Sequence, residues 1–319
     1  MAVYTAVSDA ALTRFLAGYS LGEAHSLAPI AEGVENSNYK LETAAGRYIL
    51  TLYERRVEPA ELPWFLGLME HLSTHGIICP QPVRGRDGES LRVLCGRPAC
   101  ITTFLPGRWP RRVSPAHCEA VGDVLARLHL AGGGYAPVRA NALGPAGWRP
   151  LLARCGGEAA VDTVAPGLHA ELNAALGHVL AAWPDALPRG HIHADLFPDN
   201  AFFEGERLTG IIDFYFAATD LLAYDLAVCL NAWCFADDQR PCPARASSLL
   251  AGYERVRPLD PAERAALPVL CQGAALRFLL TRLYDWLNTP PDALVTRKDP
   301  LAYLARLRHY LAREAAVAG

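Results

Sequence analysis

The chain has 319 residues, a length that suits two domains or one large bilobal domain. Hydrophobic residues make up 51% of it and charged residues 20%, which excludes a disordered, collagen-like or coiled-coil chain. The formal net charge of −3 leaves no surplus of positive charge to neutralise the phosphates of a nucleic acid. We therefore expect no nucleic-acid partner.

Cysteine usage and the lengths of the apolar runs predict a soluble, cytoplasmic protein. The nine cysteines are an odd number and form no Cys-x-x-Cys pair, which favours reduced thiols. The N-terminal residues have no basic region and reach Asp9 without a long apolar run, so no export signal is expected. The apolar stretches 221–236 and 267–280 contain Asp225 and Arg277 and are short for a membrane span. We expect no membrane partner and no obligatory protein partner.

The first third of the chain predicts a small antiparallel sheet with an internal helix. Apolar residues alternate with other residues on both sides of Ala44-Ala45-Gly46, which is typical of a hairpin. Helical spacing follows and stops at Gly76. The expected elements are a helix over residues 8–19, a hairpin over 39–53, a helix over 59–75, and strands over 91–95 and 99–104. We expect residues 1–105 to form an N-terminal lobe.

The rest of the chain is predicted to be mostly helical. Ser114-Pro115 opens a helix, because proline suits the first helical position. A short hairpin is expected over residues 201–214, with a turn at residues 204–206. Residues 132–150, rich in glycine, proline and alanine, are expected to form a long surface connection on the substrate side. Residues 106–319 then form a C-terminal lobe, and the fold class is α+β.

The most informative segment is residues 190–214. Its His193, Asp195 and Asn200 fit the kinase catalytic-loop pattern H-x-D-x-x-x-x-N, and Asp213 ends an apolar strand as the metal-binding aspartate of kinases does. Phosphoryl transfer needs a carboxylate to orient a hydroxyl and accept its proton, together with an amide oxygen and a second carboxylate to hold Mg²⁺. The intervening hairpin turns the chain back, so we expect these side chains to converge.

Two other interpretations of these residues remain. Asp195 and Asp213 can be turn or capping residues, with His193 packed in the core. His191, His193 and Asp195 can also be metal ligands of a hydrolase, but the next histidine is His309. A further group of ligand type, formed by His71, His75 and Cys79, is interrupted by a helix end and is explained more simply as an exposed terminus.

This set of motifs resembles the aminoglycoside phosphotransferase and choline kinase superfamily, and most closely its homoserine kinase branch. The stretches that carry the resemblance are residues 32–39, 46–54, 193–200, 212–217, 223–227, 230–234 and 275–286. The catalytic loop is specific only to the superfamily. The Asn-Ser-Asn loop and the Arg-Leu-Tyr-Asp-Trp helix point to the branch. The resemblance implies a protein-kinase-like two-lobe fold and ATP-dependent phosphorylation of L-homoserine, with Mg²⁺, for threonine biosynthesis.

The resemblance also implies a role for individual residues. Asp195 is expected to be the catalytic base, supported by His193, and Asp225 to be a buried carboxylate that steadies the catalytic loop. Asn200 and Asp213 are expected to bind magnesium. The residues expected to contact ATP are Gly33, Asn36, Ser37 and Asn38 over the triphosphate, Phe104 and Leu105 at the adenine, and Thr51.

Two departures from the superfamily pattern concern the triphosphate. The loop over it has a single glycine, Gly33. Thr51 stands where the superfamily has its nucleotide lysine, so Arg47, Arg55 or Arg56 has to supply the charge unless Mg²⁺ does so alone. One face of this strand is expected to cover the nucleotide and the other to pack on the helix over residues 59–75.

The acceptor residues follow from the chemistry of homoserine, which has a carboxylate that favours an arginine. Arg277 lies beside the apolar seam of the helix over residues 275–287 and is expected to bind this carboxylate. Arg282 lies about 140° further round, at ~3.6 residues per turn, and is either a second substrate residue or a partner of Asp285. Other functions that stay open are phosphorylation of choline, methylthioribose or an aminoglycoside, and a catalytically silent nucleotide-binding module.

Overall fold

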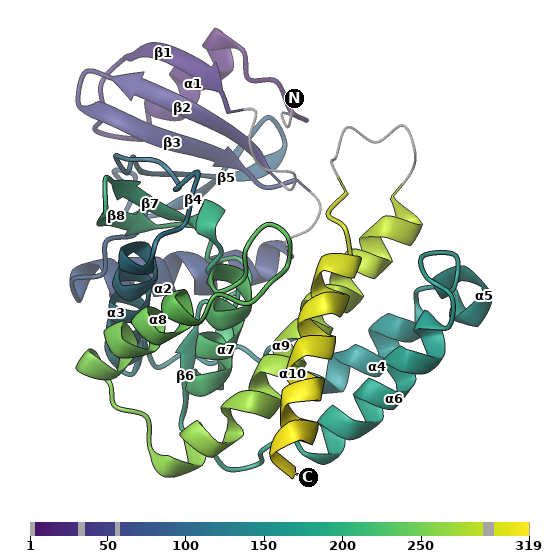
Figure 1. The fold of residues 1–319 in the computed structure, drawn as a ribbon. Coiled ribbons are helices and arrows are strands. Elements are labelled where there is room, and N and C mark those ends of the chain that lie inside the picture. The colour runs from purple at the N-terminus through teal and green to yellow at the C-terminus, as the bar shows by residue number, and fades with distance from the viewer. Residues whose placement is uncertain (1–3, 31–35, 55–57, 290–296, 319) are drawn as a thin grey trace. The chain divides into compact units, whose positions relative to one another are not determined.

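The computed structural model describes residues 4–30, 36–54, 58–289 and 297–318, and the side chains of the last helix as far as residue 314 (Figure 1). The chain forms two compact units. Unit 1 comprises Met1–Arg108, Phe202–Glu204 and Thr209–Tyr215, and unit 2 comprises Trp109–Ala201, Gly205–Leu208 and Phe216–Gly319. The predicted lobes, residues 1–105 and 106–319, are each one continuous stretch of the chain. In the structure, most of the predicted hairpin over residues 201–214 belongs to unit 1 instead.

Unit 1 is built on a five-stranded antiparallel sheet with the strand order β1-β2-β3-β5-β4. Its elements are α1 (Asp9–Leu16), β1 (Ala24–Pro29), β2 (Ser37–Thr43), β3 (Gly46–Leu52), η1 (Pro59–Glu61), α2 (Leu62–Thr74), β4 (Leu91–Leu94) and β5 (Arg97–Thr103). The predicted hairpin is β2–β3, which places Asn38 opposite Thr51. Strand β1 was not expected from the sequence, because it has no β-branched or aromatic residue.

Each face of strand β3 packs on a different helix. Leu50 and Leu52 are fully buried in one cluster with Leu12 and Phe15 of α1. On the other face, the Tyr53 ring contacts Tyr215, which in turn contacts Phe65 of α2. The prediction was that one face covers the nucleotide and the other packs on the helix over residues 59–75. The packing of α1 on this strand was not predicted, and it arises because the amphipathic helix α1 buries its apolar side against the sheet.

A second hairpin, β7 (Ala201–Glu204) and β8 (Arg207–Ile211), follows the catalytic segment as predicted. Its body is tied to the rest of unit 1 by hydrogen bonds that include two from strand β8 and a pair between Phe203 and Arg108. Thr209 Oγ1 donates to the main-chain oxygen of Pro106 at 2.7 Å, and the Ile211 N–H donates to that of Ile78 at 3.0 Å. Asp213 and Tyr215 follow this body and belong to unit 1 with it.

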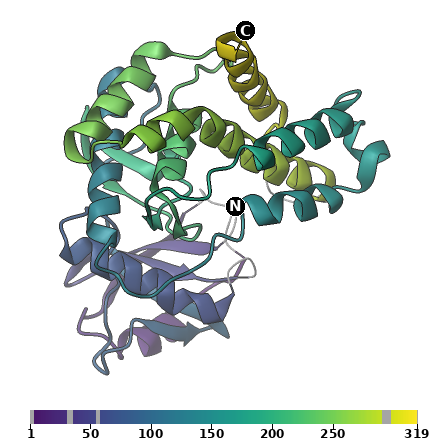
Figure 2. The ribbon, with the colours of Figure 1, turned by 90° about the horizontal axis from the view of Figure 1, so that it is seen from below.

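Unit 2 is mainly helical, with one short two-stranded sheet. Its elements are α3 (Pro115–Gly132), α4 (Pro145–Ala153), α5 (Gly157–Val161), α6 (Leu168–Ala181), β6 (Arg189–Ile192), η2 (Pro198–Asn200), β9 (Ala218–Leu221), α7 (Leu222–Trp233), α8 (Pro243–Val256), α9 (Pro261–Asn288) and α10 (Leu301–Ala318). Within this unit α4, α6 and α10 contact α9, as Figures 1 and 2 show. Together with unit 1, this arrangement confirms the predicted α+β class.

Two glycines set how closely helices α3 and α8 of unit 2 approach. Gly122 of α3 meets the backbone of α8 at Leu249, and Gly252 of α8 meets that of α3 at Glu119, with no room for a Cβ atom at either glycine. This close approach brings Tyr253 of α8 within reach of α3. A larger residue at either glycine would separate the helices.

The prediction of a loop over residues 132–150 is wrong in its last part, because α4 begins at Pro145. Proline is favourable in the first helical turn, but Pro150, which lies inside the helix, made the segment resemble a connection. Helix α9 is long and apolar enough to cross a membrane by length and composition. However, 72% of its most apolar window is buried inside the protein, as in the core helix of a globular domain.

Candidate active site

The catalytic segment leaves the sheet of unit 2 at the end of β6. Strand β6 pairs antiparallel with β9, so Ile192 lies opposite Ala218. The chain then turns sharply at Ala194, whose φ of 62° is uncommon for a residue with a side chain. The turn places Asp195 before the short helix η2, which ends at Asn200.

Asp225 of α7 stabilises this turn through hydrogen bonds to its backbone. Its carboxylate accepts hydrogen bonds from the main-chain N–H groups of His193, at 2.7 Å, and Ala194, at 2.8 Å. A third bond comes from His129 Nε2 at 3.1 Å, and both side chains are fully buried. These bonds satisfy the buried carboxylate and fix the backbone just before Asp195.

The partners of His129 extend this network to Arg257 and Glu263 of unit 2. The Tyr253 hydroxyl bonds to His129 Nδ1 at 2.8 Å and accepts from Arg257 Nη1 at 3.0 Å. Arg257 is in turn paired with Glu263 at 2.9 Å. Burial raises the pKa of Tyr253, so this hydroxyl stays protonated and can donate to the ring. The imidazole is thereby oriented with its Nε2–H toward Asp225.

Asp195 is 18% exposed and contacts two side chains of unit 2. Arg277 Nη1 lies 3.3 Å from Asp195 Oδ1. The Asn200 amide nitrogen donates to the main-chain oxygen of Asp195 at 2.8 Å and to its Oδ2 at 3.3 Å. The predicted proximity of Asp195 and Asn200 is thus present, and the oxygen of the Asn200 amide is the atom of that side chain able to bind a cation.

The two histidines of the loop have structural partners. His193 is fully buried, and its Nδ1 lies 3.3 Å from the main-chain nitrogen of Asp195. His191 Nε2 lies 2.7 Å from the Tyr135 main-chain oxygen and its Nδ1 lies 3.2 Å from Thr219 Oγ1. In the part of the chain that the structure describes, no group of three or more His, Cys, Asp or Glu could hold a metal ion. The hydrolase interpretation has no support here.

Asp213 lies two residues beyond β8, in unit 1. It has a φ of 66°, and the next residue, Phe214, is buried. Such a backbone conformation is strained for a residue with a side chain, and strained positions of this kind cluster at functional sites. Asp195 and Asn200 belong to unit 2, so the two predicted magnesium ligands, Asn200 and Asp213, belong to different units.

Of the predicted triphosphate loop, Gly33 lies outside the described residues, as do Arg55 and Arg56. Ser37 is fully buried, and its hydroxyl donates to Glu54 at 2.6 Å while accepting from the Tyr4 N–H at 2.8 Å.

Asn36 and Asn38, the neighbours of Ser37 in the loop, also have protein partners. Asn36 is buried, and its Oδ1 accepts a long bond of 3.4 Å from the Glu54 N–H. Thr51 Oγ1 donates to Asn38 Oδ1 at 2.8 Å, which leaves the Asn38 amino group as a donor for a ligand.

Phe104 and Leu105 follow the end of β5, where the adenine contact was predicted. Among the described residues, neither main chain takes part in a hydrogen bond outside the strands. Arg47 stacks on the Phe104 ring, with its guanidinium carbon 4.7 Å from the ring centre. The one described candidate for the substitute cation therefore lies beside the predicted adenine residue.

The two predicted substrate arginines have different surroundings. Arg277 is 4% exposed, pairs with Asp195 and lies over the Phe278 ring at 3.8 Å. Arg282 donates to the Asp299 main-chain oxygen at 3.2 Å and lies over the Tyr303 ring at 4.5 Å. Only Arg277 is thus in contact with the predicted base.

A cavity of ≈ 220 Å³ adjoins Arg277 within unit 2. Residues that line it are Ala142, Leu143, Gly147, Trp148, Pro150, Leu151, Arg154 and Arg277. It is smaller than the pockets that bind drug-sized ligands, so it suits a metabolite with few atoms. Arg154 and His129 were not predicted from the sequence, because no short spacing connects either to a recognised motif.

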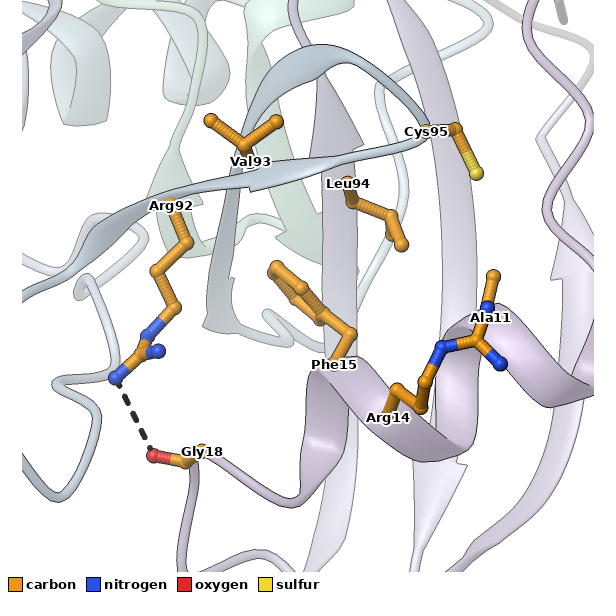
Figure 3. A pocket seen from close by; sticks show the side chains of 8 residues that line it. All are labelled: Ala11, Arg14, Phe15, Gly18, Arg92, Val93, Leu94 and Cys95. Carbon is orange, nitrogen blue, oxygen red and sulfur yellow. Dashed lines mark hydrogen bonds between the residues drawn. The ribbon is translucent and has the colours of Figure 1, made fainter.

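A larger cavity of ≈ 590 Å³ lies in unit 1 between α1 and β4 (Figure 3). Arg92 reaches from β4 toward the Gly18 main-chain oxygen at 3.5 Å, and Phe15 and Leu94 point between the two elements. None of the predicted site residues lines this cavity. It is therefore not the candidate active site.

The model of the phosphotransferase enzyme family matches residues 26–259, and the chain belongs to this family. It is 66% identical over 311 residues to the homoserine kinase of Granulibacter bethesdensis, an alignment that covers 98% of this chain and 97% of the relative. It is 64% identical over 322 residues to the homoserine kinase of Gluconacetobacter diazotrophicus, with both chains fully covered.

Solved structures of the same fold agree with this assignment. An amicoumacin kinase in complex with AMP-PNP, Ca²⁺ and Ami has a TM-score of 0.72 at 18% identity, covering 96% of this chain and 93% of that one. A spectinomycin phosphotransferase in complex with ADP and spectinomycin has a TM-score of 0.66 at 14% identity, covering 93% of both chains. At these identities the likeness concerns the fold, and it confirms the predicted protein-kinase-like class.

Proposed function

We propose that this chain is a kinase that transfers a phosphoryl group from ATP to the hydroxyl of L-homoserine and forms O-phospho-L-homoserine. The observation that carries the proposal is the identity of 58–66% to homoserine kinases over nearly the full chain. The reaction suits a cytoplasmic enzyme of threonine biosynthesis.

Within this reaction Asp195 is the catalytic base. Its carboxylate is partly exposed, as a group that accepts the acceptor's hydroxyl proton has to be, and it contacts Arg277, which lines a cavity of metabolite size. His193 is buried, so its part is to hold the Asp195 backbone rather than to touch substrate. Asp225 fixes the turn before Asp195 through the two N–H groups.

Asn200 and Asp213 would hold Mg²⁺ together with the phosphates of ATP. Their amide and carboxylate oxygens are hard ligands of the kind Mg²⁺ prefers, and Mg²⁺ in kinases is held by few protein groups plus substrate phosphates. When bound, the cation neutralises the charge on the phosphates. Asn200 already contacts Asp195, so a group that it binds lies next to the base.

The ATP contacts are proposed for the loop around Asn36–Asn38 and for the chain after β5. The Asn38 amino group serves the triphosphate, whereas the buried Ser37 hydroxyl supports the loop. The main chain of Phe104 and Leu105 is available to the adenine edge.

Charge at the cavity favours an acceptor with a carboxylate. The described residues that line it carry two positive charges, on Arg154 and Arg277, and no negative charge. Choline and aminoglycosides are cations, which such a wall repels. Arg277 and Arg282 stay our predicted acceptor residues, and Arg277 has the closer place through its contact with Asp195.

The function is tested by ADP release in a coupled assay with L-homoserine, choline, methylthioribose and an aminoglycoside as acceptors. We expect turnover with L-homoserine far above that with the other three. Absence of turnover with every acceptor, combined with intact ATP binding, would support a catalytically silent nucleotide-binding module instead.

Replacement of Thr51 gives a prediction for the nucleotide site. Thr51→Ala removes one hydrogen bond to Asn38. The short, uncharged hydroxyl of Thr51 cannot neutralise the phosphates as a lysine does, so its loss should cost little. We expect turnover to fall within about tenfold, or ~1.4 kcal/mol, when measured by steady-state ADP release. Thr43→Ala, at the other end of the hairpin, is the matched control. A loss well beyond a hundredfold in a folded variant would mean that the Thr51 hydroxyl has the role of the missing lysine.

A further inference from the structure

We infer that Arg154 binds the carboxylate of the amino-acid acceptor, an inference that rests on the proposed function. The cavity wall offers two guanidinium groups, Arg154 and Arg277. Arg277 is already occupied, because one nitrogen contacts Asp195 and its plane lies over Phe278. Among the residues that the structure describes, no carboxylate is bonded to Arg154, whose hydrogen bond goes to the Tyr284 hydroxyl at 3.0 Å.

One face of helix α9 carries both Arg277 and Tyr284, the residue to which Arg154 is bonded. Gly273, Arg277 and Tyr284 are separated by four and seven residues, which puts them on one side of a helix with ~3.6 residues per turn. Gly273 leaves room for the rings of Trp148 and Trp183, and these rings contact each other at 5.1 Å.

Trp148 anchors α4 on this face. Its side chain is buried, and its Nε1 donates to the Leu143 main-chain oxygen at 2.8 Å. Arg154 caps the same helix and lies over the Tyr284 ring at 4.5 Å. The Arg154 guanidinium is thus held in place before a ligand arrives, which lowers the entropy cost of binding.

The two arginines then have separate tasks. Arg277 lies on Asp195, so it belongs at the hydroxyl end of the acceptor. Arg154 is an exposed residue that lines the same cavity of ≈ 220 Å³, so a molecule of amino-acid size can contact both groups. A guanidinium pairs with a carboxylate through two parallel hydrogen bonds, which distinguishes an acid from its amide.

The test compares L-homoserine with L-homoserine amide as acceptors for the parent and for Arg154→Gln. We expect the variant to lose about tenfold to a hundredfold in kcat/KM for the acid, the effect of one charge-assisted bond. For the amide we expect a change within about threefold, and the KM for ATP should be unchanged. Arg154→Lys should recover part of the preference for the acid.

Arg149→Gln is the matched control, since Arg149 is exposed on the same helix and is not among the residues that line the cavity. It should behave as the parent does. If Arg154→Gln discriminates between acid and amide as the parent does, or loses activity equally with both, Arg154 is not the carboxylate site. Turnover of L-homoserine by the parent tests the proposed function separately, because its absence overturns both ideas before any variant is compared.

Discussion

Asp195→Asn is expected to keep nucleotide binding and to lose turnover by about 10²–10⁴-fold, the range attributed to a general base. The amide has nearly the same shape as the carboxylate but cannot accept the proton of the acceptor's hydroxyl. Asn200 can still donate to the main-chain oxygen of residue 195, so the loop should keep its conformation. Turnover is measured by coupled ADP release with L-homoserine, and nucleotide binding by titration calorimetry with a non-hydrolysable ATP analogue.

Asp199→Asn is the matched control for this variant. Asp199 lies four residues further along the same loop, is 55% exposed, and has a 3.7 Å contact with Lys298 that contributes little to stability. It should retain the activity of the parent. An Asp195→Asn enzyme of full activity would show that the proton is accepted elsewhere.

Asp225→Asn is expected to lower the free energy of unfolding and to lower turnover as well. Asp225 accepts three hydrogen bonds in a buried position. An asparagine amide has an NH₂ group in place of one carboxylate oxygen, so at least one of the three N–H donors would face another donor. Breaking a buried pair in this way costs about 3–5 kcal/mol. Urea unfolding followed by circular dichroism measures the loss, and Asp237→Asn on the exposed segment after α7 should leave the stability unchanged.

The pH dependence gives an independent check of the same carboxylate. Burial by itself raises the pKa of Asp225, but the hydrogen bond from His129 and the interactions with His193 outweigh it and hold the pKa below its ordinary value. Its contribution to stability is therefore complete above the unfolded-state pKa of about 3.9 and is lost as the pH falls through the lower, folded-state value. The stability of Asp225→Asn should depend less on pH in this acid range. Parallel curves for both proteins would contradict the assignment.

The parts of the fold and site that could be predicted depend on short-range patterns. The β2–β3 hairpin follows from strand alternation on both sides of a short turn, which Ala44 and Ala45 form in the structure. The loop carrying Asp195 and Asn200 follows from a spacing of five residues, and the structure places the two side chains in contact. Asp225 was expected to steady this loop because of the family resemblance, and its bonds to the loop backbone agree with that role.

The parts that could not be predicted depend on contacts between distant residues. His129 is 96 residues from Asp225, and Arg154 is 130 residues from Tyr284. No local spacing identifies such pairs. The sequence indicates that Arg277 lies at the edge of the core, but it does not indicate that a carboxylate of the catalytic loop is its neighbour. Helix α4 was missed because its prolines suggest a connection, whereas burial of Trp148 stabilises the helix.

The hairpin β7–β8 has a consequence for any attempt to divide this protein. The chain passes from one unit to the other after residues 108, 201, 204, 208 and 215. A gene fragment that stops at residue 108 encodes the sheet without Tyr215, whose hydroxyl bonds to that of Tyr53 at 2.8 Å. A chimaera that exchanges unit 1 between two relatives therefore has to exchange three segments at once: Met1–Arg108, Phe202–Glu204 and Thr209–Tyr215.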